Sequence, residues 1–316
     1  AKGFAFLNML QLIGWTSIMI YDAMLALQEL APLSPMIWTI AIGALVILWL
    51  FIGLHNTGYI QAIVSVLLLG LTLYMGAHMI SQWPSEGILL TSGNMSFIAA
   101  LELSIAMPLS WLPLISDYTR ESKNPFSASL TSAAVYTVTS IVMYTLGLSA
   151  AIFGGGDSII TIMMNAGLGL AGLIVIIFST VTTTFMDAYS AGVSSTTIYN
   201  GASSKGIAVI VTIVGTIAAI LYPMDDITDF LYLIGSVFAP MIAILLADYF
   251  INRQQVQTLS AYLVRGLIWA ASVGLYHYML HSESTIGATL PAFTMAFVIT
   301  AIVGFISKTA HISTEI

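Results

Sequence analysis

The chain has 316 residues, of which 59% are hydrophobic and only 7% are charged, and its formal net charge at pH 7 is −7. Soluble domains carry about 25% charged residues, so this composition excludes an ordinary soluble enzyme and indicates a membrane protein. The lack of a basic surface excludes nucleic acid as a partner, and the absence of cysteine excludes disulfides and thiolate metal sites.

Ten hydrophobic runs follow one another along the chain, each long enough to cross a bilayer as a helix. Each run is bounded by proline, glycine or a polar cluster. The predicted spans cover residues 4–30, 36–54, 57–80, 95–120, 126–153, 168–199, 206–222, 227–252, 259–281 and 286–307. The sequence therefore predicts an all-α, polytopic membrane protein in which residues 1–316 form a single transmembrane domain.

The basic residues predict the orientation of these spans. Six of them precede the first span or follow an even-numbered one: Lys2, Arg120, Lys123, Lys205, Arg253 and Lys308. The seventh, Arg265, lies a short way into the ninth span, and we expect it to extend back to the same side. Because basic loops face the cytoplasm, we expect a plasma-membrane protein with both ends of this chain in the cytoplasm.

The first span carries one helix face made of Gln11, Trp15, Met19 and Asp22, at spacings of four, four and three. Trp15 lies near the middle of the span, where an indole either stacks on a flat ligand ring or packs in the bundle core. Asp22 lies closer to the outer end, where it can meet water. We treat Trp15 and Met19 as candidate substrate-binding residues.

The fourth span contains two prolines, Pro108 and Pro113, each of which removes a backbone donor from the helix. We therefore expect this helix to be broken and to line a cavity, as broken helices do in secondary transporters. Glu102 precedes the break at membrane depth, which makes it a candidate substrate-binding group. The alternative is a structural acid paired with a buried hydroxyl.

Three more residues of the fourth span are candidates. Trp111 follows the expected break and either stacks on the substrate or packs against neighbouring helices. Asp117 and Arg120, at the inner end, either pair with each other at a spacing of three or close an inner gate.

The sixth span carries three hydroxyls and a carboxylate on one helix face: Ser179, Thr182, Thr183 and Asp187. Hard oxygen ligands of this kind suit Na⁺. The alternative is that the hydroxyls donate to carbonyls of their own or a neighbouring helix. Asp187 is a candidate proton site or gate.

No sequence motif of a hydrolase nucleophile, a phosphate-binding loop or a zinc protease is present in a supporting context, so we do not expect an enzyme. We expect no cofactor beyond a coupling ion, either Na⁺ or H⁺, and the sequence indicates no obligate protein partner. The expected partners are a small molecule and the lipid bilayer.

The strings LPLISDYTR and DFLYLIGSVFAPMIAILLADYFINR, at the ends of spans four and eight, resemble segments of the nucleobase:cation symporter-1 family. LNMLQLIGWTSIMI and AMPLSWLPLISDYTR resemble its CytX-type hydroxymethylpyrimidine permeases. The resemblance covers essentially the whole chain. It implies a leucine-transporter-like fold with inverted repeats, in which the ten spans match family helices three to twelve. The family's first two helices have no counterpart, so we expect an N-terminally truncated chain.

The resemblance also implies roles for single residues. Trp15 matches a tryptophan that stacks on the substrate, and Met19 stands where several relatives place an amide that hydrogen-bonds it. Thr182 and Thr183 match a hydroxyl pair that helps to bind the cation, and Ser179 matches a carbonyl ligand. A second stacking tryptophan falls near residues 107–108, and Trp111 is the nearest tryptophan in this chain.

The function expected from these observations is cation symport of a small planar nitrogen heterocycle. Hydroxymethylpyrimidine, a thiamine precursor, is the first choice of substrate, and cytosine, another nucleobase or an allantoin-type compound is the alternative. Glu102 would accept hydrogen bonds from the exocyclic amine and a ring donor. The other classes left open are a channel, a non-functional fragment and an intramembrane enzyme. The enzyme would need an acid pair, a Ser–Lys arrangement or a metal cluster facing one cavity, and Glu102 and Asp187 within hydrogen-bonding reach of one another would favour it.

Overall fold

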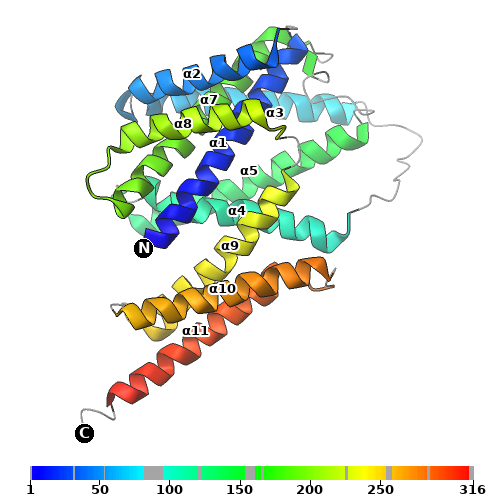
Figure 1. The fold of residues 1–316 in the computed structure, drawn as a ribbon. Coiled ribbons are helices and arrows are strands. Elements are labelled where there is room, and N and C mark those ends of the chain that lie inside the picture. The colour runs from blue at the N-terminus through cyan, green and yellow to red at the C-terminus, as the bar shows by residue number, and fades with distance from the viewer. Residues whose placement is uncertain are drawn as a thin grey trace. The chain divides into compact units, whose positions relative to one another are not determined.

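The computed structural model describes residues 2–30, 33–52, 54–81, 95–119, 122–153, 161, 163–164, 167–224, 227–253, 258–282 and 285–312 (Figure 1). Within these residues, ten helices are long and apolar enough to cross a membrane. The predicted number of spans is therefore confirmed for the described part of the chain.

The helices lie close to the predicted spans. Their bounds are α1 Lys2–Leu30, α2 Pro35–Ile52, α3 Leu54–Ser81, α4 Phe97–Thr119, α5 Pro125–Phe153, α7 Gly169–Ile198, α8 Ser204–Leu221, α9 Thr228–Leu246, α10 Leu259–His281 and α11 Thr289–Ile312. A single turn of π-helix, η1 (Ala247–Asn252), continues α9. A lipid-exposed segment must satisfy its backbone hydrogen bonds internally, so continuous apolar runs of this length form helices.

Polar side chains mark the beginnings of several helices. Asn124 Oδ1 accepts from the Ser127 amide at the start of α5, and Ser203 Oγ accepts from Gly206 at the start of α8. Thr258 Oγ1 does the same for Ala261 at the start of α10. Since the first amides of a helix have no carbonyl partner within it, these caps fix where each helix begins.

The expected break in the fourth span is wrong. α4 is helical from Phe97 to Thr119, with Pro108 and Pro113 both inside it. A proline removes one donor and crowds one turn, but in transmembrane helices hydroxyl side chains and local adjustment compensate for this loss. The Ser110 hydroxyl donates to the Met107 carbonyl within α4, although the carbonyls that lose their helix donors to the prolines are those of Ser104 and Leu109. The helix continues through both prolines.

The chain forms two compact units, each described here by itself. Unit 1 comprises Ala1–Thr91 and Ile115–Asp225, and unit 2 comprises Ser92–Leu114 and Asp226–Ile316. The division falls inside α4, directly after the turn that contains Pro113. Most of α4 thus belongs to unit 2, together with α9, η1, α10 and α11.

In unit 1, α1 packs along both α7 and α8, and α2 contacts the same two helices. Ile20, Leu27, Ile42 and Leu173 belong to one buried apolar cluster of this unit. Gly215 of α8 lies so close to α1 that a side chain there would overlap Thr16. Small residues at helix contacts allow such close packing in membranes, where no hydrophobic effect drives helices together.

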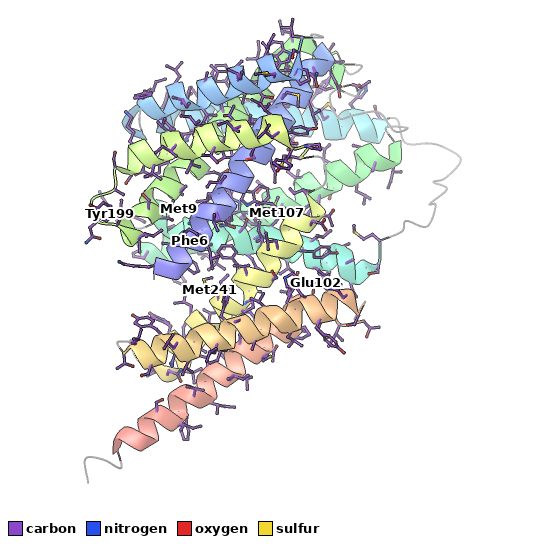
Figure 2. The ribbon with its side chains drawn as sticks, viewed as in Figure 1. Phe6, Met9, Glu102, Met107, Tyr199 and Met241 are labelled. Carbon is purple, nitrogen blue, oxygen red and sulfur yellow. The ribbon has the colours of Figure 1, made fainter. Side chains whose placement is uncertain are left out.

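In unit 2, α11 packs against α9, η1 and α10. Ala243, Ile268 and Ala296 form a small buried cluster among them. Side chains project from both sides of α10 (Figure 2), and its exposed ones are largely apolar, including Leu259, Leu263 and Leu267. Apolar outward faces of this kind suit contact with lipid tails.

Candidate functional site

The polar face predicted for the sixth span lies on α7, in unit 1. The helix is continuous over this region, so Ser179, Thr182, Thr183 and Asp187 share one face. Thr182 and Asp187 are buried, and Ser179 and Thr183 are half-buried. Because α7 packs against α1 and α8, this part of α7 lies inside the unit rather than on its surface.

The hydroxyls of this face partly serve their own helix. Thr182 Oγ1 donates to the Ser179 carbonyl oxygen at 3.0 Å. A hydroxyl that donates one hydrogen bond keeps its lone pairs, so Thr182 can still act as an oxygen ligand. The bond is therefore compatible with a Na⁺ site and also with a hydroxyl that only donates to a carbonyl of its own helix. The Na⁺ site stays a prediction.

Asp187 is the buried acid of unit 1. Its side chain is only 7% exposed, and no described group donates a hydrogen bond to it or pairs with it. Burying a neutral polar group without a hydrogen-bond partner costs about 2–7 kcal/mol. Burying an isolated carboxylate costs more, because a charge loses more hydration than a neutral group. Ionisable residues retained at such a cost inside a membrane protein are functional candidates by default.

A line of amide and hydroxyl groups joins α1 to α7, and it meets α7 at Ser194, two turns after Asp187. Asn8 Nδ2 donates to Ser194 Oγ at 2.9 Å, and Gln11 Nε2 donates to Asn8 Oδ1 at 2.7 Å. Asn8, Gln11 and Ser190 are buried. We refer to Asn8, Gln11, Asp187, Ser190 and Ser194 together as the α1–α7 seam.

The sequence reasoning missed three members of the seam: Asn8, Ser190 and Ser194. A signal for them was present. Asn8 precedes Gln11 by three residues, and Ser190 and Ser194 follow Asp187 by three and seven, so each prolongs a helix face already identified.

The seam also shows how α1 and α7 are aligned. Asn8 meets Ser194 at one end of the pair, and Leu27 and Leu173 share a cluster at the other, so the two helices are antiparallel. Trp15 follows Asn8 by seven residues, and Asp187 precedes Ser194 by seven. Because the helices are antiparallel, Trp15 and Asp187 lie at the same height along the α1–α7 pair.

By the same count Met19 is level with Thr183, since each lies eleven residues from the Asn8–Ser194 bond. Trp15 and Met19 are half-buried. The structure therefore brings the predicted substrate residues of α1 and the predicted cation residues of α7 to the same part of unit 1.

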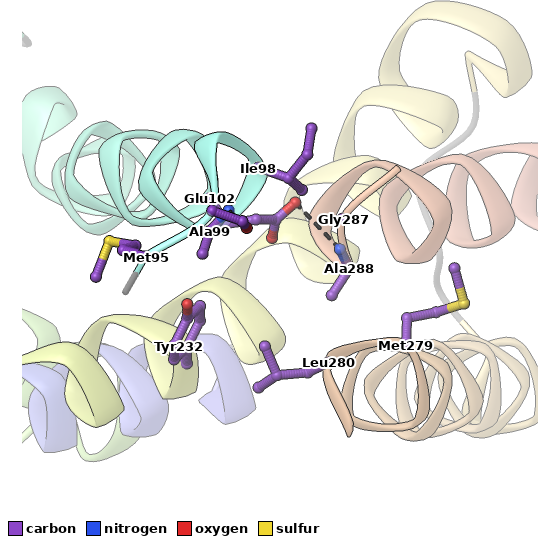
Figure 3. A pocket seen from close by; sticks show the side chains of 10 residues that line it. Met95, Ile98, Ala99, Glu102, Tyr232, Met279, Leu280, Gly287 and Ala288 are labelled. Atoms are coloured by element: carbon purple, nitrogen blue, oxygen red, sulfur yellow. Dashed lines mark hydrogen bonds between the residues drawn. The ribbon is translucent and has the colours of Figure 1, made fainter. Parts of the chain in front are cut away.

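Glu102 belongs to unit 2, where it holds the beginning of α11 (Figure 3). Its Oε1 accepts from the amides of Ala288 and Thr289, each at 3.1 Å, and Oε2 accepts from the Thr289 amide at 2.9 Å. The Thr289 hydroxyl also donates to Oε2. A carboxylate in this position satisfies amides that have no partner in the helix and complements its dipole.

Gly287 allows this contact. Its φ is +75°, a conformation that side chains rarely adopt, and a Cβ there would overlap the Glu102 carboxylate. The partners of Glu102 lie 186 and 187 residues away in the sequence, so sequence spacing alone offered no way to predict them.

Glu102 also lines a pocket of about 540 Å³ that lies wholly in unit 2. The start of α4, α9, the end of α10 and the start of α11 surround it (Figure 3). Its lining residues are Met95, Ser96, Ile98, Ala99, Glu102, Tyr232, Met279, Leu280, Gly287 and Ala288.

The other candidates of the fourth span do not join Glu102 in this pocket. Trp111 follows Glu102 by nine residues, about 900° around a continuous helix, and so lies on the opposite face of α4. The side chain of Asp117 and all of Arg120 lie outside the described residues. Trp15 and Thr183 belong to unit 1, so a recess that they share with Glu102 stays a prediction.

A second acid of unit 2 is paired. Asp248 of η1 accepts from Arg265 of α10 through two bonds, Nη2 to Oδ1 at 2.8 Å and Nε to Oδ2 at 3.1 Å. The two side chains are 15% and 14% exposed. Asn252 donates to the same carboxylate and to the Thr300 carbonyl of α11. Asp248 thus holds the Arg265 side chain, and the expectation that Arg265 extends back to the cytoplasmic side stays a prediction.

Comparison with known proteins agrees with these features. The sequence pattern of the family described as "Permease for cytosine/purines, uracil, thiamine, allantoin" matches residues 4–316. The cytosine permease of Escherichia coli K12 is 26% identical over 177 residues, which are 56% of this chain and 42% of that permease. The same values hold for the cytosine permeases of two other Escherichia coli strains, CFT073 and O157:H7. The chain thus matches less than half the length of these curated relatives.

A solved structure shares the fold. The nucleobase-cation-symport-1 family transporter Mhp1, in a closed conformation with bromovinylhydantoin bound, aligns with a TM-score of 0.77 at 15% identity. The alignment covers 96% of this chain and 76% of that one. The fold class expected from the sequence, an all-helical polytopic protein of the leucine-transporter type, is confirmed.

Proposed function

This chain belongs to the family of permeases for cytosine/purines, uracil, thiamine and allantoin, and we propose that it carries a small planar nitrogen heterocycle across a membrane as a cation symporter. The observation that carries the proposal is the α1–α7 seam, a buried acid and a line of amides and hydroxyls inside a unit of membrane-spanning helices. Placing such groups inside a bilayer costs free energy, so the groups that are present there typically belong to a transport pathway or a binding site.

The substrate class that we propose is the aminopyrimidines. Hydroxymethylpyrimidine is the first choice, by resemblance to the CytX-type branch. Cytosine is the second, supported by the likeness to the cytosine permease of Escherichia coli. Both compounds present an amino group beside a ring nitrogen on a flat ring. Trp15 would stack on that ring, and the bound bromovinylhydantoin of Mhp1 supports a flat heterocyclic ligand.

The amino group and ring nitrogen need donors and acceptors at the level of Trp15. Gln11 lies one turn before Trp15 on α1 and can supply both through its amide, while Met19 supplies an apolar contact on the other side. Trp111 stays a predicted stacking partner. Glu102, whose oxygens accept from α11, stays a predicted acceptor on which this proposal does not depend.

We further propose that the coupling cation binds beside Asp187, held by oxygens of Ser179, Thr182 and Thr183. A buried carboxylate without a partner is stabilised by any single positive charge, either Na⁺ or a proton. The hard oxygens of the neighbouring hydroxyls favour Na⁺. Asp117 and Arg120 stay predicted gate residues, and we place the protein in the plasma membrane with Lys2 and Lys308 facing the cytoplasm.

Uptake of labelled hydroxymethylpyrimidine and cytosine into proteoliposomes tests the proposal, using protein made from the whole reading frame that contains this sequence. We expect saturable uptake that requires an inward Na⁺ or proton gradient. Trp15→Ala should reduce it at least about tenfold, the loss expected for one well-packed aromatic contact of about 1.5 kcal/mol.

The matched control is Phe6→Ala on the same helix, since Phe6 is exposed (Figure 2) and lies away from the seam. Equal uptake by Trp15→Ala and Phe6→Ala would remove Trp15 from the site. Uptake that does not saturate and ignores both gradients would favour a channel.

A further inference from the structure

The pocket beside Glu102 is lined by residues of unit 2 and is large enough to hold a small ligand. Its volume of about 540 Å³ falls within the range of small-molecule sites, roughly 300–1,000 Å³. All its lining residues belong to unit 2, whereas the α1–α7 seam lies entirely in unit 1.

The walls of the pocket are mainly apolar. Met95 lies just before α4 and Ile98 in its first turn, and Met279 and Leu280 contribute from the end of α10 (Figure 3). Methionine side chains are flexible and polarisable, so such walls adapt to ligands of different shape. An apolar ligand body of the size of one ring therefore fits this lining.

The polar part of the lining is fixed in place. Glu102 is only 6% exposed, and three donors of α11 orient its carboxylate. These donors make four hydrogen bonds, two to each oxygen, so Glu102 offers a ligand its negative charge rather than an empty acceptor position. The Tyr232 side chain stands on the neighbouring wall, where its ring and hydroxyl can face the same ligand.

The charge of this region is negative. The donors to Glu102 are neutral groups, and the helix dipole offsets only about half a charge. Asp229 lies exposed one turn before Tyr232 on α9. No described lining residue is basic, and the sequence has no Lys or Arg between residues 3 and 119 or between 266 and 307. A positively charged ligand is therefore favoured.

We propose that this pocket is a second binding site, which takes a small organic cation with an apolar body, such as a protonated primary amine on a single ring. The ammonium group lies beside the Glu102 carboxylate, attracted by its negative charge, and near the Tyr232 ring. The apolar body packs between Met95, Met279 and Leu280. The inference does not depend on which substrate is transported.

Benzylammonium is a suitable probe, and benzyl alcohol is its neutral counterpart of the same shape. We expect benzylammonium to raise the thermal unfolding midpoint of the purified protein in detergent by about 2–4 °C, with saturation. Benzyl alcohol at the same concentration should leave the midpoint unchanged. An equal rise with both compounds, or no rise with benzylammonium, overturns the proposal.

Two adjacent alanines of α4 locate the binding. Ala99 lines the pocket, whereas Ala100 is exposed and does not. Ala99→Phe should fill the pocket and abolish the benzylammonium shift, and Ala100→Phe should retain it. If Ala99→Phe does not fold, Leu280→Trp reduces the space in the same pocket from the end of α10. A shift that survives filling of the pocket places the ligand elsewhere and overturns the proposal.

Discussion

The buried acids of the two units differ in how their charge is compensated. In unit 2, Glu102 accepts from the first amides of α11, and Asp248 pairs with Arg265 through two bonds. In unit 1, Asp187 is buried to a similar degree, yet no described group donates to it. Elsewhere in the seam, Gln11 donates to Asn8 and Asn8 donates to Ser194.

We distinguish buried acids that stabilise the fold from buried acids that serve a function by whether their charge has a partner. A compensated acid joins elements of the fold, so its loss leaves partners without a bond and lowers stability. An acid without a partner contributes no such bond, and its desolvation opposes folding. The first kind is retained for the structure it builds, and we infer that the second kind is retained for a ligand that brings a positive charge.

The largest loss of stability is expected when the ion pair of unit 2 is broken. Arg265→Ala leaves Asp248 buried without its partner and should lower stability by about 3 kcal/mol, the lower end of measured values because the pair is slightly exposed. Thermal or denaturant unfolding in detergent measures this. The matched control is Arg253→Ala, since Arg253 is exposed at the end of η1. Equal losses in the two variants would show that the pair is not structural.

A smaller loss is expected at the beginning of α11. Glu102→Ala leaves the amides of Ala288 and Thr289 without their acceptor, which should cost about 2 kcal/mol. Glu102→Gln keeps one acceptor oxygen and should cost about half as much. Ser104→Ala, on an exposed position of the same helix, is the control. If alanine and glutamine at position 102 are equally stable, Glu102 does not act as a cap.

The packing around Asn252 gives a third test in unit 2. A side chain at Gly304 would overlap the Asn252 carboxamide, so Gly304→Ala should cost about 1–2 kcal/mol through displacement of Asn252 from Asp248 and Thr300. Gly266→Ala on α10 meets nothing nearby and should be neutral or slightly stabilising, because alanine favours helix over glycine. Similar behaviour of the two variants would contradict this packing.

The smallest effect is expected in unit 1. Ser194→Ala removes the hydroxyl to which Asn8 donates, a loss of about 1 kcal/mol or less for a neutral bond in a membrane protein. Ser195→Ala removes only a bond to the carbonyl of its own helix at Gly192, and it serves as the control. A loss from Ser194→Ala as large as that from Arg265→Ala would mean that the seam is as structural as the ion pair.

The spans were predictable because composition and run length decide them. With η1 counted as part of α9, every described span begins and ends within five residues of its prediction. The α4 prediction failed because the effect of Pro108 and Pro113 depends on neighbouring groups that a local rule does not consider. The polar faces of α1 and α7 follow from helical spacing, and the same spacing extends them to Asn8, Ser190 and Ser194.

Long-range pairing was the part that sequence could not supply. The hydrogen bonds of Asn8 to Ser194 and of Glu102 to Ala288 each join residues 186 positions apart. Spacing along one helix predicts which side chains share a face but not which other helix that face meets. Glu102 was therefore identified as a buried acid of interest, while its contact with α11 was not.

The most direct test of this account is the variant Asp187→Asn, with stability and uptake measured on the same preparation. We expect uptake of the labelled aminopyrimidine to fall to background, while the unfolding midpoint stays unchanged or rises because a buried charge without a partner has been removed. Unchanged uptake, or a loss of stability comparable to that of Glu102→Ala, would contradict the claim that Asp187 is retained for a positively charged ligand.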